Sequence, residues 1–267
     1  MKDEQIFAME EQWGTLKEEY GAEAFLHIPV PVIYSRSFAD AEYITEELSR
    51  FIYKEKIIGK TNPGHADYLV FSASYSTCMD HDFAVIQDLY NHIRNAGGYY
   101  GAYRGILLVD ISEWCGHFRD KHFDIILSYL SDQRENGIIS FFYADCGECG
   151  ADRHVLEAVI SPYFSSFTVC YGTDELFGYA VSLMEGEGIL LEGDAGRYLE
   201  DFIRESLRSE LFHGTESVRR VCEGVARRYR TSQGRATIDG PHLKAAIKDL
   251  GYEGIYKEMP AKVIGFR

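Results

Sequence analysis

Residues 31–58 have the layout of a phosphate-binding loop without its residue types. The segment PVIYSRSFADAEYITEELSRFIYKEKII reads as a short apolar strand, a turn and an amphipathic helix. A P-loop places the pattern G-x-x-x-x-G-K-[ST] at such a junction. Laid on that pattern, the two glycines become Ser35 and Asp40, the lysine becomes Ala41 and the Ser/Thr becomes Glu42. The junction keeps the frame of a phosphate site and lacks the groups that bind phosphate.

These exchanges reverse the electrostatics of the junction. A P-loop holds anionic phosphates with bare backbone N–H groups, a lysine and the positive end of a helix. Carboxylates at Asp40 and Glu42 favour that helix end but repel phosphate. Asp40 is also a good candidate for the N-cap of the helix. The sequence therefore predicts a nucleotidase-like fold that has lost its nucleotide chemistry.

The elements around this junction alternate between strand and helix. Apolar runs bounded by turn residues predict the strands, and apolar residues every three to four positions predict the helices. The predicted strands are 30–34, 68–72, 106–110, 138–143 and 167–171, and the predicted helices are 40–53, 83–95, 121–133 and 152–160. This alternation indicates an α/β fold with a doubly wound parallel sheet.

Strand signals nearly vanish after residue 173. Helices are predicted there at 174–184, 195–207, 217–229 and 242–250. The chain therefore divides into an N-terminal helical segment (1–24), an α/β domain (25–172) and a small α-helical domain (173–267).

Composition narrows the partners and the compartment. The formal net charge of −15 argues against a nucleic-acid backbone or an anionic membrane surface as partner. No apolar run reaches the length of about 18 residues that a membrane span needs, and the acidic start MKDEQIFAMEEQWG is no secretory signal. The six scattered cysteines favour a reducing compartment over a disulfide framework. We expect a cytoplasmic protein.

The ordered elements resemble those of AAA+ ATPases, in which an α/β domain precedes a helical lid. The run GILLVDISEW looks like the Walker B strand of the CbbX/stage V sporulation protein K branch, usually GVLFIDEAY. The ending VIGF is similar to the IGF ending common in that branch. The resemblance extends from about Phe25 to Arg267. It implies an AAA+-like P-loop NTPase fold, a parallel doubly wound sheet followed by a small α-helical lid.

The resemblance also assigns positions around the nucleotide. The Walker A lysine falls at Ala41 and the Mg²⁺-binding Ser/Thr at Glu42. The Walker B aspartate is retained as Asp110. The neighbouring catalytic glutamate is Ile111, and Glu113 lies two residues beyond it, where a strand would point it elsewhere. Only the Walker B aspartate of this set survives.

The remaining family positions are also exchanged. The sensor-1 residue falls near Ala144 and Asp145, where the sequence has no Asn or Thr. The arginine finger falls at Ser166. The sensor-2 arginine falls near Ser217, although a one-residue gap brings in Arg219. Together these losses imply a chain freed from the need to hydrolyse ATP.

The resemblance thus implies a catalytically inactive subunit, a pseudo-ATPase with a structural or regulatory role. It would assemble with an active AAA+ partner or another protein, as a homo- or hetero-oligomer, and no cofactor is expected. The alternative is a nucleotide-binding AAA+ ATPase with divergent Walker motifs, a protein-remodelling motor that would take ATP or ADP with Mg²⁺.

A third hypothesis is a zinc-stabilised interaction module. Cys146 and Cys149 form a CxxC that follows one predicted strand, with His154 shortly after it, and Cys115 and His117 follow a neighbouring strand. Because the carboxyl ends of parallel strands share one edge of a sheet, these groups could meet and bind zinc. The other interpretation is ordinary loop cysteines, since a second CxxC is missing.

Overall fold

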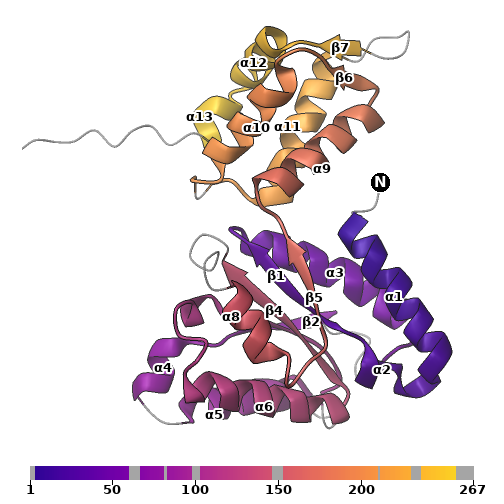
Figure 1. Ribbon diagram of the computed structural model, residues 1–267, viewed down its shortest axis with the longest axis vertical. Coiled ribbons are helices and arrows are strands. Elements are labelled where there is room, and N and C mark those ends of the chain that lie inside the picture. The colour runs from indigo at the N-terminus through magenta and orange to yellow at the C-terminus, as the bar shows by residue number, and fades with distance from the viewer. Residues whose placement is uncertain are drawn as a thin grey trace, which may run out of the picture. The chain divides into compact units, whose positions relative to one another are not determined.

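The computed structural model describes residues 4–59, 67–80, 83–97, 103–145, 153–209, 211–229 and 236–256. The chain forms two compact units, and the division falls between Cys170 and Tyr171 (Figure 1). The first unit is an α/β sheet and the second is mainly helical. The VIGF ending, Cys146 and Cys149 lie outside the described residues.

The first unit contains one parallel sheet of five strands. These are β1 (Val30–Ser35), β2 (Tyr68–Ser72), β3 (Gly105–Asp110), β4 (Ile138–Asp145) and β5 (Ser166–Cys170), in the spatial order β2-β3-β4-β1-β5. The predicted α/β fold with a parallel sheet is confirmed. Since β4 lies between β1 and β3, Ser35 at the end of β1 pairs with Asp145, while Asp110 pairs with Tyr143. The candidate residues Ser35, Asp110 and Asp145 therefore lie together at the carboxyl ends of the strands.

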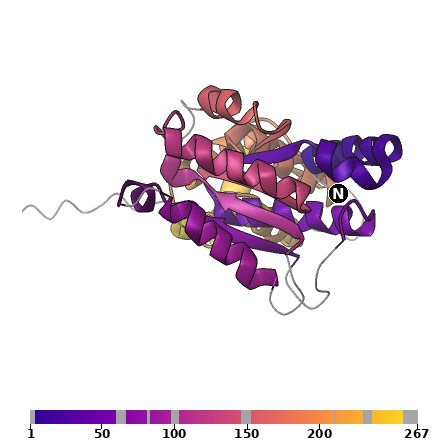
Figure 2. The ribbon, with the colours of Figure 1, turned by 90° about the horizontal axis from the view of Figure 1, so that it is seen from below.

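Helices cover both faces of this sheet (Figure 2). On one side, α3 (Phe38–Lys54) packs against β1 to β4, and on the other lie α5 (Ala84–Gly97) and α6 (Lys121–Glu135). Side chains of β2 point alternately to the two faces of the sheet. Tyr68 lies on the side of α3, where the charge of Glu42 acts on it, and Phe71 lies on the side of α5, where its ring centre is 5.7 Å from that of His92. The short helices α4 (Tyr75–Asp80) and α8 (Arg153–Ile160) follow β2 and β4.

The N-terminal helix belongs to the first unit. Helix α1 (Glu4–Tyr20) buries Ile6, Met9 and Trp13, the face that their spacing predicts. The indole Nε1 of Trp13 donates to the carbonyl of Pro29 at 3.1 Å, just before β1. After α1 the chain passes through a 3₁₀ turn (Gly21–Glu23) and α2 (Ala24–His27) to reach the sheet.

A buried arginine joins the end of α6 to this entry segment. Arg134 is 8% exposed, and its Nε donates to the carbonyl of Phe25 at 2.8 Å. A second guanidinium nitrogen donates to the carbonyl of Ile28. Burial lowers the pKa of Arg134 to about 10. The cation satisfies two carbonyls that the turn between α2 and β1 would otherwise leave buried without a donor.

The two edge strands of the sheet, β5 and β2, differ in how their outer backbone groups are hydrogen-bonded. At β5, the side-chain amide of Gln5 donates to the carbonyl of Cys170 and accepts from its N–H, both at 3.2 Å, as a neighbouring strand would. At the opposite edge, β2 pairs only with β3 among the described strands. Val70 in the middle of β2 is 38% exposed. At β5 the backbone groups of Cys170 are therefore bound by α1, whereas no described strand pairs with the outer side of β2.

The second unit is built from helices with one small strand pair. Its elements are α9 (Thr173–Gly186), β6 (Ile189–Leu191), α10 (Ala195–Ser206), α11 (Gly214–Tyr229), β7 (Ala236–Ile238), α12 (Gly240–Asp249) and α13 (Tyr252–Tyr256). The apolar faces predicted for α10 and α11 are buried. The parallel pair β6–β7 was not predicted, because strands of three residues are too short to show alternation. None of the helices in the described part of the chain is long and apolar enough to cross a membrane.

Candidate functional site

The junction between β1 and α3 is a tight turn. Strand β1 ends at Ser35, and α3 begins at Phe38 with Ser37 as its N-cap, so only Arg36 and Ser37 connect them. The predicted N-cap at Asp40 is wrong, since Asp40 is the third residue of the helix. Ala41 is fully buried within the first turn of α3. A loop that surrounds a phosphate needs several non-helical residues with free N–H groups, and this turn does not supply them.

The first turn of α3 holds an anion of its own. The hydroxyl of Ser35 donates to Oδ2 of Asp40 at 2.5 Å and accepts from the N–H of Ser37 at 3.1 Å. The N–H of Asp40 donates to the carbonyl of Ser37 at 3.0 Å. Both Ser35 and Asp40 are 1% exposed. A carboxylate at this place is stabilised by the positive end of the helix, which is the feature that attracts phosphate in a P-loop.

A cation beside the end of β1 is also neutralised within the chain. The guanidinium of Arg153 lies 5.4 Å from the ring centre of Tyr34, and its Nε donates to Glu157 at 3.0 Å. Thr168 donates to the same carboxylate at 3.1 Å. Although partial burial opposes it, these hydrogen bonds hold the pKa of Glu157 below its usual value. Arg153 therefore already has a carboxylate partner.

The retained Asp110 acts in a local turn. Its Oδ1 accepts from the N–H of Ser112 at 2.9 Å, and a 3₁₀ turn (Ser112–Trp114) follows. Ile111 is fully buried, and its N–H donates to Tyr143 at 2.9 Å, so the pairing with β4 continues past the end of β3. The hydroxyl of Ser112 accepts from the N–H of Asp145 at 3.1 Å. The carboxylate that would face Mg²⁺ in an ATPase caps its own loop here.

Glu113 ties the loop after β3 to the loop after β2. Its Oε2 accepts from the hydroxyl of Ser74 at 2.9 Å and from the N–H of Tyr75 at 3.0 Å, at the start of α4. The indole Nε1 of Trp114 donates to the carbonyl of Ala73 at 2.7 Å. The ring of Tyr75 also stacks on His117, with centres 4.1 Å apart. The two loops form one packed body.

Of the other positions assigned by the resemblance, Ala144 and Asp145 lie beside Tyr34 and Ser35 at the end of β4, and the remaining positions lie elsewhere. Ala144 is buried in β4, and Ser166 is exposed at the opposite end of the sheet, where it pairs with Val30. Ser217 and Arg219 lie on α11 in the second unit. The hydroxyl of Ser217 accepts from the N–H of His213 at 2.8 Å, and Arg219 is exposed.

The described residues form no zinc site. Cys115 is disulfide-bonded, so its sulfur is not a thiolate ligand in this state, whereas Cys78, Cys170 and Cys222 are free. The side chain of His154 is 94% exposed. No group of three metal-ligating side chains occurs among the residues that the structure describes. The predicted ligands Cys146 and Cys149 lie outside them.

A surface cavity of about 470 Å³ lies between the loop after β3 and α8. Its described walls are Gly116, His117, Phe118, Arg119, Asp120 and Val155. Within this set, Oδ1 of Asp120 accepts a hydrogen bond from the N–H of His122 at 2.8 Å and lies 2.7 Å from Nδ1 of the same histidine. These described walls contain no buried charged side chain that could fix a ligand.

Comparison with known proteins gives likenesses to solved structures. The sequence matches no protein-family model and no curated protein sequence. A variant of RuvB from Thermotoga maritima resembles the chain with a TM-score of 0.39 and 12% identity, over 89% of this chain and 69% of that one. Domain III of the replication initiation protein DnaA from Thermotoga maritima gives 0.42 and 10%, over 94% and 92%. Closed-state Hsp104 with ATPγS and FITC casein gives 0.38 and 13%, over 91% and 41%. Such values transfer no function, so the function is argued from the junction itself.

Sequence reasoning located the junction but missed how it is closed. The spacing of Ser35 and Asp40 was visible, yet their hydrogen bond depends on a helix that starts at Phe38, two residues before the predicted start. Ser37, an ordinary N-cap residue preceding an apolar one, was the available signal. The roles of Glu113 and Gln5 require contacts between distant segments, which no local pattern shows.

Proposed function

We propose that this chain is a catalytically inactive AAA+ ATPase-like subunit that acts through protein contacts in a structural or regulatory role. The observation that carries the proposal is the closed junction between β1 and α3. There the connection is two residues long, and the buried Asp40 carboxylate takes the place at the helix end that an anionic ligand would need. A phosphate brought to this helix end would meet a negative charge already held there.

The chemistry of phosphoryl transfer supports the same conclusion. Catalysis in nucleotidases depends on positioning and on neutralising the charge of the phosphates, with a lysine and Mg²⁺ as the main cations. Here the lysine position is a buried alanine, Ala41, and the Mg²⁺-ligand position is Glu42 on a helix. A finger arginine contributes roughly 10³–10⁵ in rate where one is used, and the corresponding Ser166 has no charge. Of the lysine, Mg²⁺-ligand, finger and Walker B positions that the resemblance assigns, only Asp110 keeps the family's residue type, and its carboxylate caps a turn.

The partner is then a protein. Assembly with an active AAA+ subunit follows from the resemblance to the CbbX/stage V sporulation protein K branch, and a net charge of −15 favours a basic partner surface. Three arginines of the positive run on α11, Arg220, Arg227 and Arg228, each pair with a carboxylate within 3.3 Å, which supports a protein partner over a nucleic acid.

One observation favours the alternative, a nucleotide-binding AAA+ motor. Asp110 stands at the carboxyl end of β3, where parallel-sheet enzymes place ligand-binding groups. In that case Asp110 would hold Mg²⁺ when nucleotide binds and would release the N–H of Ser112.

Calorimetry with MgATP and MgADP on the full chain, with a mass measurement on the same sample, separates these functions. The inactive subunit predicts no heat of binding up to millimolar nucleotide and no phosphate release. Saturable binding at micromolar nucleotide, together with an ATPase activity that Asp110→Ala abolishes, would overturn the proposal in favour of the motor.

A further inference from the structure

The backbone groups at the open edge of β2 can be assigned residue by residue. The N–H of Ala73 donates to the carbonyl of Asp110, so Ala73 faces β3. Along a strand the backbone groups of alternate residues point to opposite sides. Leu69 and Phe71 therefore also face β3, and Tyr68, Val70 and Ser72 present their N–H and C=O groups at the open edge.

Strand β2 itself, as the structure describes it, lacks a proline, a charged residue and a bulge. Proteins block exposed edges with prolines, inward charges, bulges or covering side chains. The strand YLVFS contains no proline and no charge, and its pairing with β3 runs without a break in register. The same chain does protect its other edge, where Gln5 binds both backbone groups of Cys170. The unprotected state of β2 is therefore specific to this edge.

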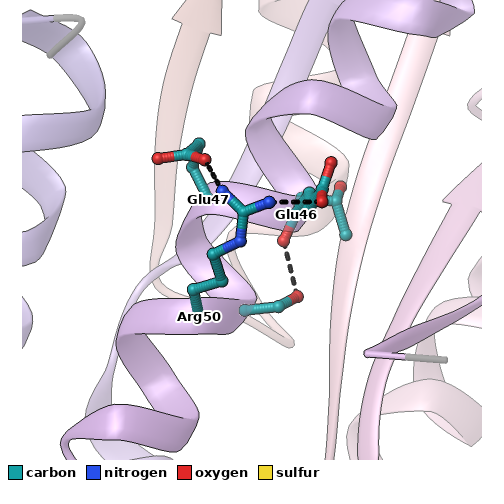
Figure 3. A network of polar contacts seen from close by, with 5 residues as sticks. Glu46, Glu47 and Arg50 are labelled. Atoms are coloured by element: carbon teal, nitrogen blue, oxygen red, sulfur yellow. Dashed lines mark hydrogen bonds and ion pairs between the residues drawn. The ribbon is translucent and has the colours of Figure 1, made fainter. Parts of the chain in front are cut away.

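Carboxylates gather at one end of the open edge. Glu42 is exposed in the first turns of α3, and burial together with the charges of Glu42, Glu46 and Asp67 raises the pKa of Tyr68. One turn further along α3, Arg50 pairs with both Glu46 and Glu47 (Figure 3). No ion pair of Glu42 occurs within the described part of the chain. The carboxylates of Glu42, Glu46 and Asp67 thus act on Tyr68, at the start of β2.

We propose that the β2 edge binds an extended segment of a partner protein, which adds to the sheet as a sixth strand and places a lysine or arginine beside Tyr68, Glu42 and Asp67. Main-chain hydrogen bonds to Tyr68, Val70 and Ser72 supply the affinity, and the carboxylates select the basic end of the segment. The inference rests on the proposed function only in assigning a protein-binding role, because the edge geometry does not depend on the closed junction.

Binding of two synthetic peptides to the full chain tests this assignment. The probes are labelled KTVTVTK and its acidic counterpart ETVTVTE, followed by fluorescence anisotropy, with hydrogen exchange to locate the protected amides. We expect saturable binding of the basic peptide that protects the amides of 68–72. The acidic peptide should bind about fivefold more weakly at low salt, a difference that shrinks as salt rises or with Glu42→Gln.

Matched variants distinguish peptide binding through backbone hydrogen bonds of β2 from nonspecific binding to the surface. Val70→Pro removes an outward N–H that makes no bond to β3, a change that edge strands tolerate, and Val70→Thr keeps the N–H at the same position. Binding should be lost in the first and kept in the second. Ser72→Pro serves the same purpose if Val70→Pro does not fold by circular dichroism.

Three results would overturn the inference. They are absence of peptide binding, binding that survives the proline variants, and self-association of the pure chain that Val70→Pro abolishes, which would assign the edge to a second copy. Failure here leaves the nucleotide calorimetry unchanged, and nucleotide binding there leaves the peptide result unchanged. The two proposals therefore fail separately.

Discussion

Replacing Asp40 tests whether its carboxylate stabilises the junction in place of a ligand. Asp40 is 1% exposed, receives a 2.5 Å hydrogen bond from Ser35 and lies in the first turn of α3. A hydrogen bond to a charged group contributes about 1.5–3 kcal/mol, and a charge at a helix terminus adds roughly 0.3–1 kcal/mol. Because removing the carboxylate also recovers part of its desolvation cost, we expect Asp40→Ala to lower the free energy of unfolding of the first unit by about 2 kcal/mol.

Tryptophan fluorescence in urea measures this change selectively. The chain has two tryptophans, Trp13 and Trp114, and both are fully buried in the first unit. Glu42→Gln is the matched control, because it removes an equal charge from the same helix at an exposed position and should change stability by less than about 0.5 kcal/mol. Asp40→Asn should fall between the two, since it keeps a hydrogen-bonding shape without the charge.

The reasoning would be refuted by an Asp40→Ala chain as stable as the parent. Equal losses in Asp40→Ala and Glu42→Gln would also refute it, because the effect would then report overall charge and not a buried contact. A gain in stability for Asp40→Ala would show that the carboxylate is held at a cost, as in a site that awaits a cation.

Three further predictions follow from other contacts. The double variant Asp40→Gly/Ala41→Lys restores two P-loop residue types and should still show no MgATP binding by calorimetry, because the turn remains two residues long; micromolar binding would contradict this. Burial raises the pKa of Tyr53 to about 12, so the stability that its protonated form contributes is complete below pH 10 and is lost as the pH rises through 12. Tyr53→Phe should therefore flatten the fall of the urea midpoint between pH 10 and 12, and an unchanged slope would exclude this tyrosine. Arg134→Ala should cost about 3 kcal/mol in the same assay, because it leaves the carbonyls of Phe25 and Ile28 without a donor, while Arg134→Lys should recover part of that loss.

The sequence predicted those parts of the fold that local patterns encode. The long apolar strands, such as Gly105–Asp110, and the amphipathic face of α3 carry strong periodic signals, and the parallel sheet follows from their alternation. The helix start at Phe38 was placed two residues late because Asp40 competes with Ser37 as a cap, and only tertiary burial of Asp40 decides between them. The disulfide bond of Cys115 could not be derived from scattered cysteines.

The sequence predicted where the candidate site lies but not which hydrogen bonds close it. Residue exchanges at Ala41 and Glu42 indicated lost chemistry, but the shortened turn follows from where the strand and helix end. The contacts of Glu113 with Ser74 and Tyr75 join residues 38 and 39 positions apart, which no single-sequence pattern reports. Nor did the local pattern of α1 reveal that Gln5 covers β5.

The polar groups at the carboxyl ends of the strands form hydrogen bonds within the chain. In a nucleotidase, polar groups at the ends of parallel strands wait for a ligand, and their hydrogen-bonding capacity is completed when it binds. Here the hydroxyl of Ser35 donates to Asp40, and the carboxylate of Asp110 accepts from the N–H of Ser112. The carboxylate of Glu113 accepts from the N–H of Tyr75 at the start of α4. Under the proposed inactive role, these contacts would have to be broken before a nucleotide could use the same groups.

If the chain is the inactive subunit proposed above, it must act through surfaces that do not depend on nucleotide. The open edge of β2 is such a surface, because its backbone groups are arranged by pairing with β3 and not by a ligand. A partner segment bound there would join the same sheet whose opposite edge strand, β5, is contacted by Gln5 at Cys170. In the proposed role, the junction between β1 and α3 is closed by Ser35 and Asp40, and β2 is the strand that offers a position for a partner.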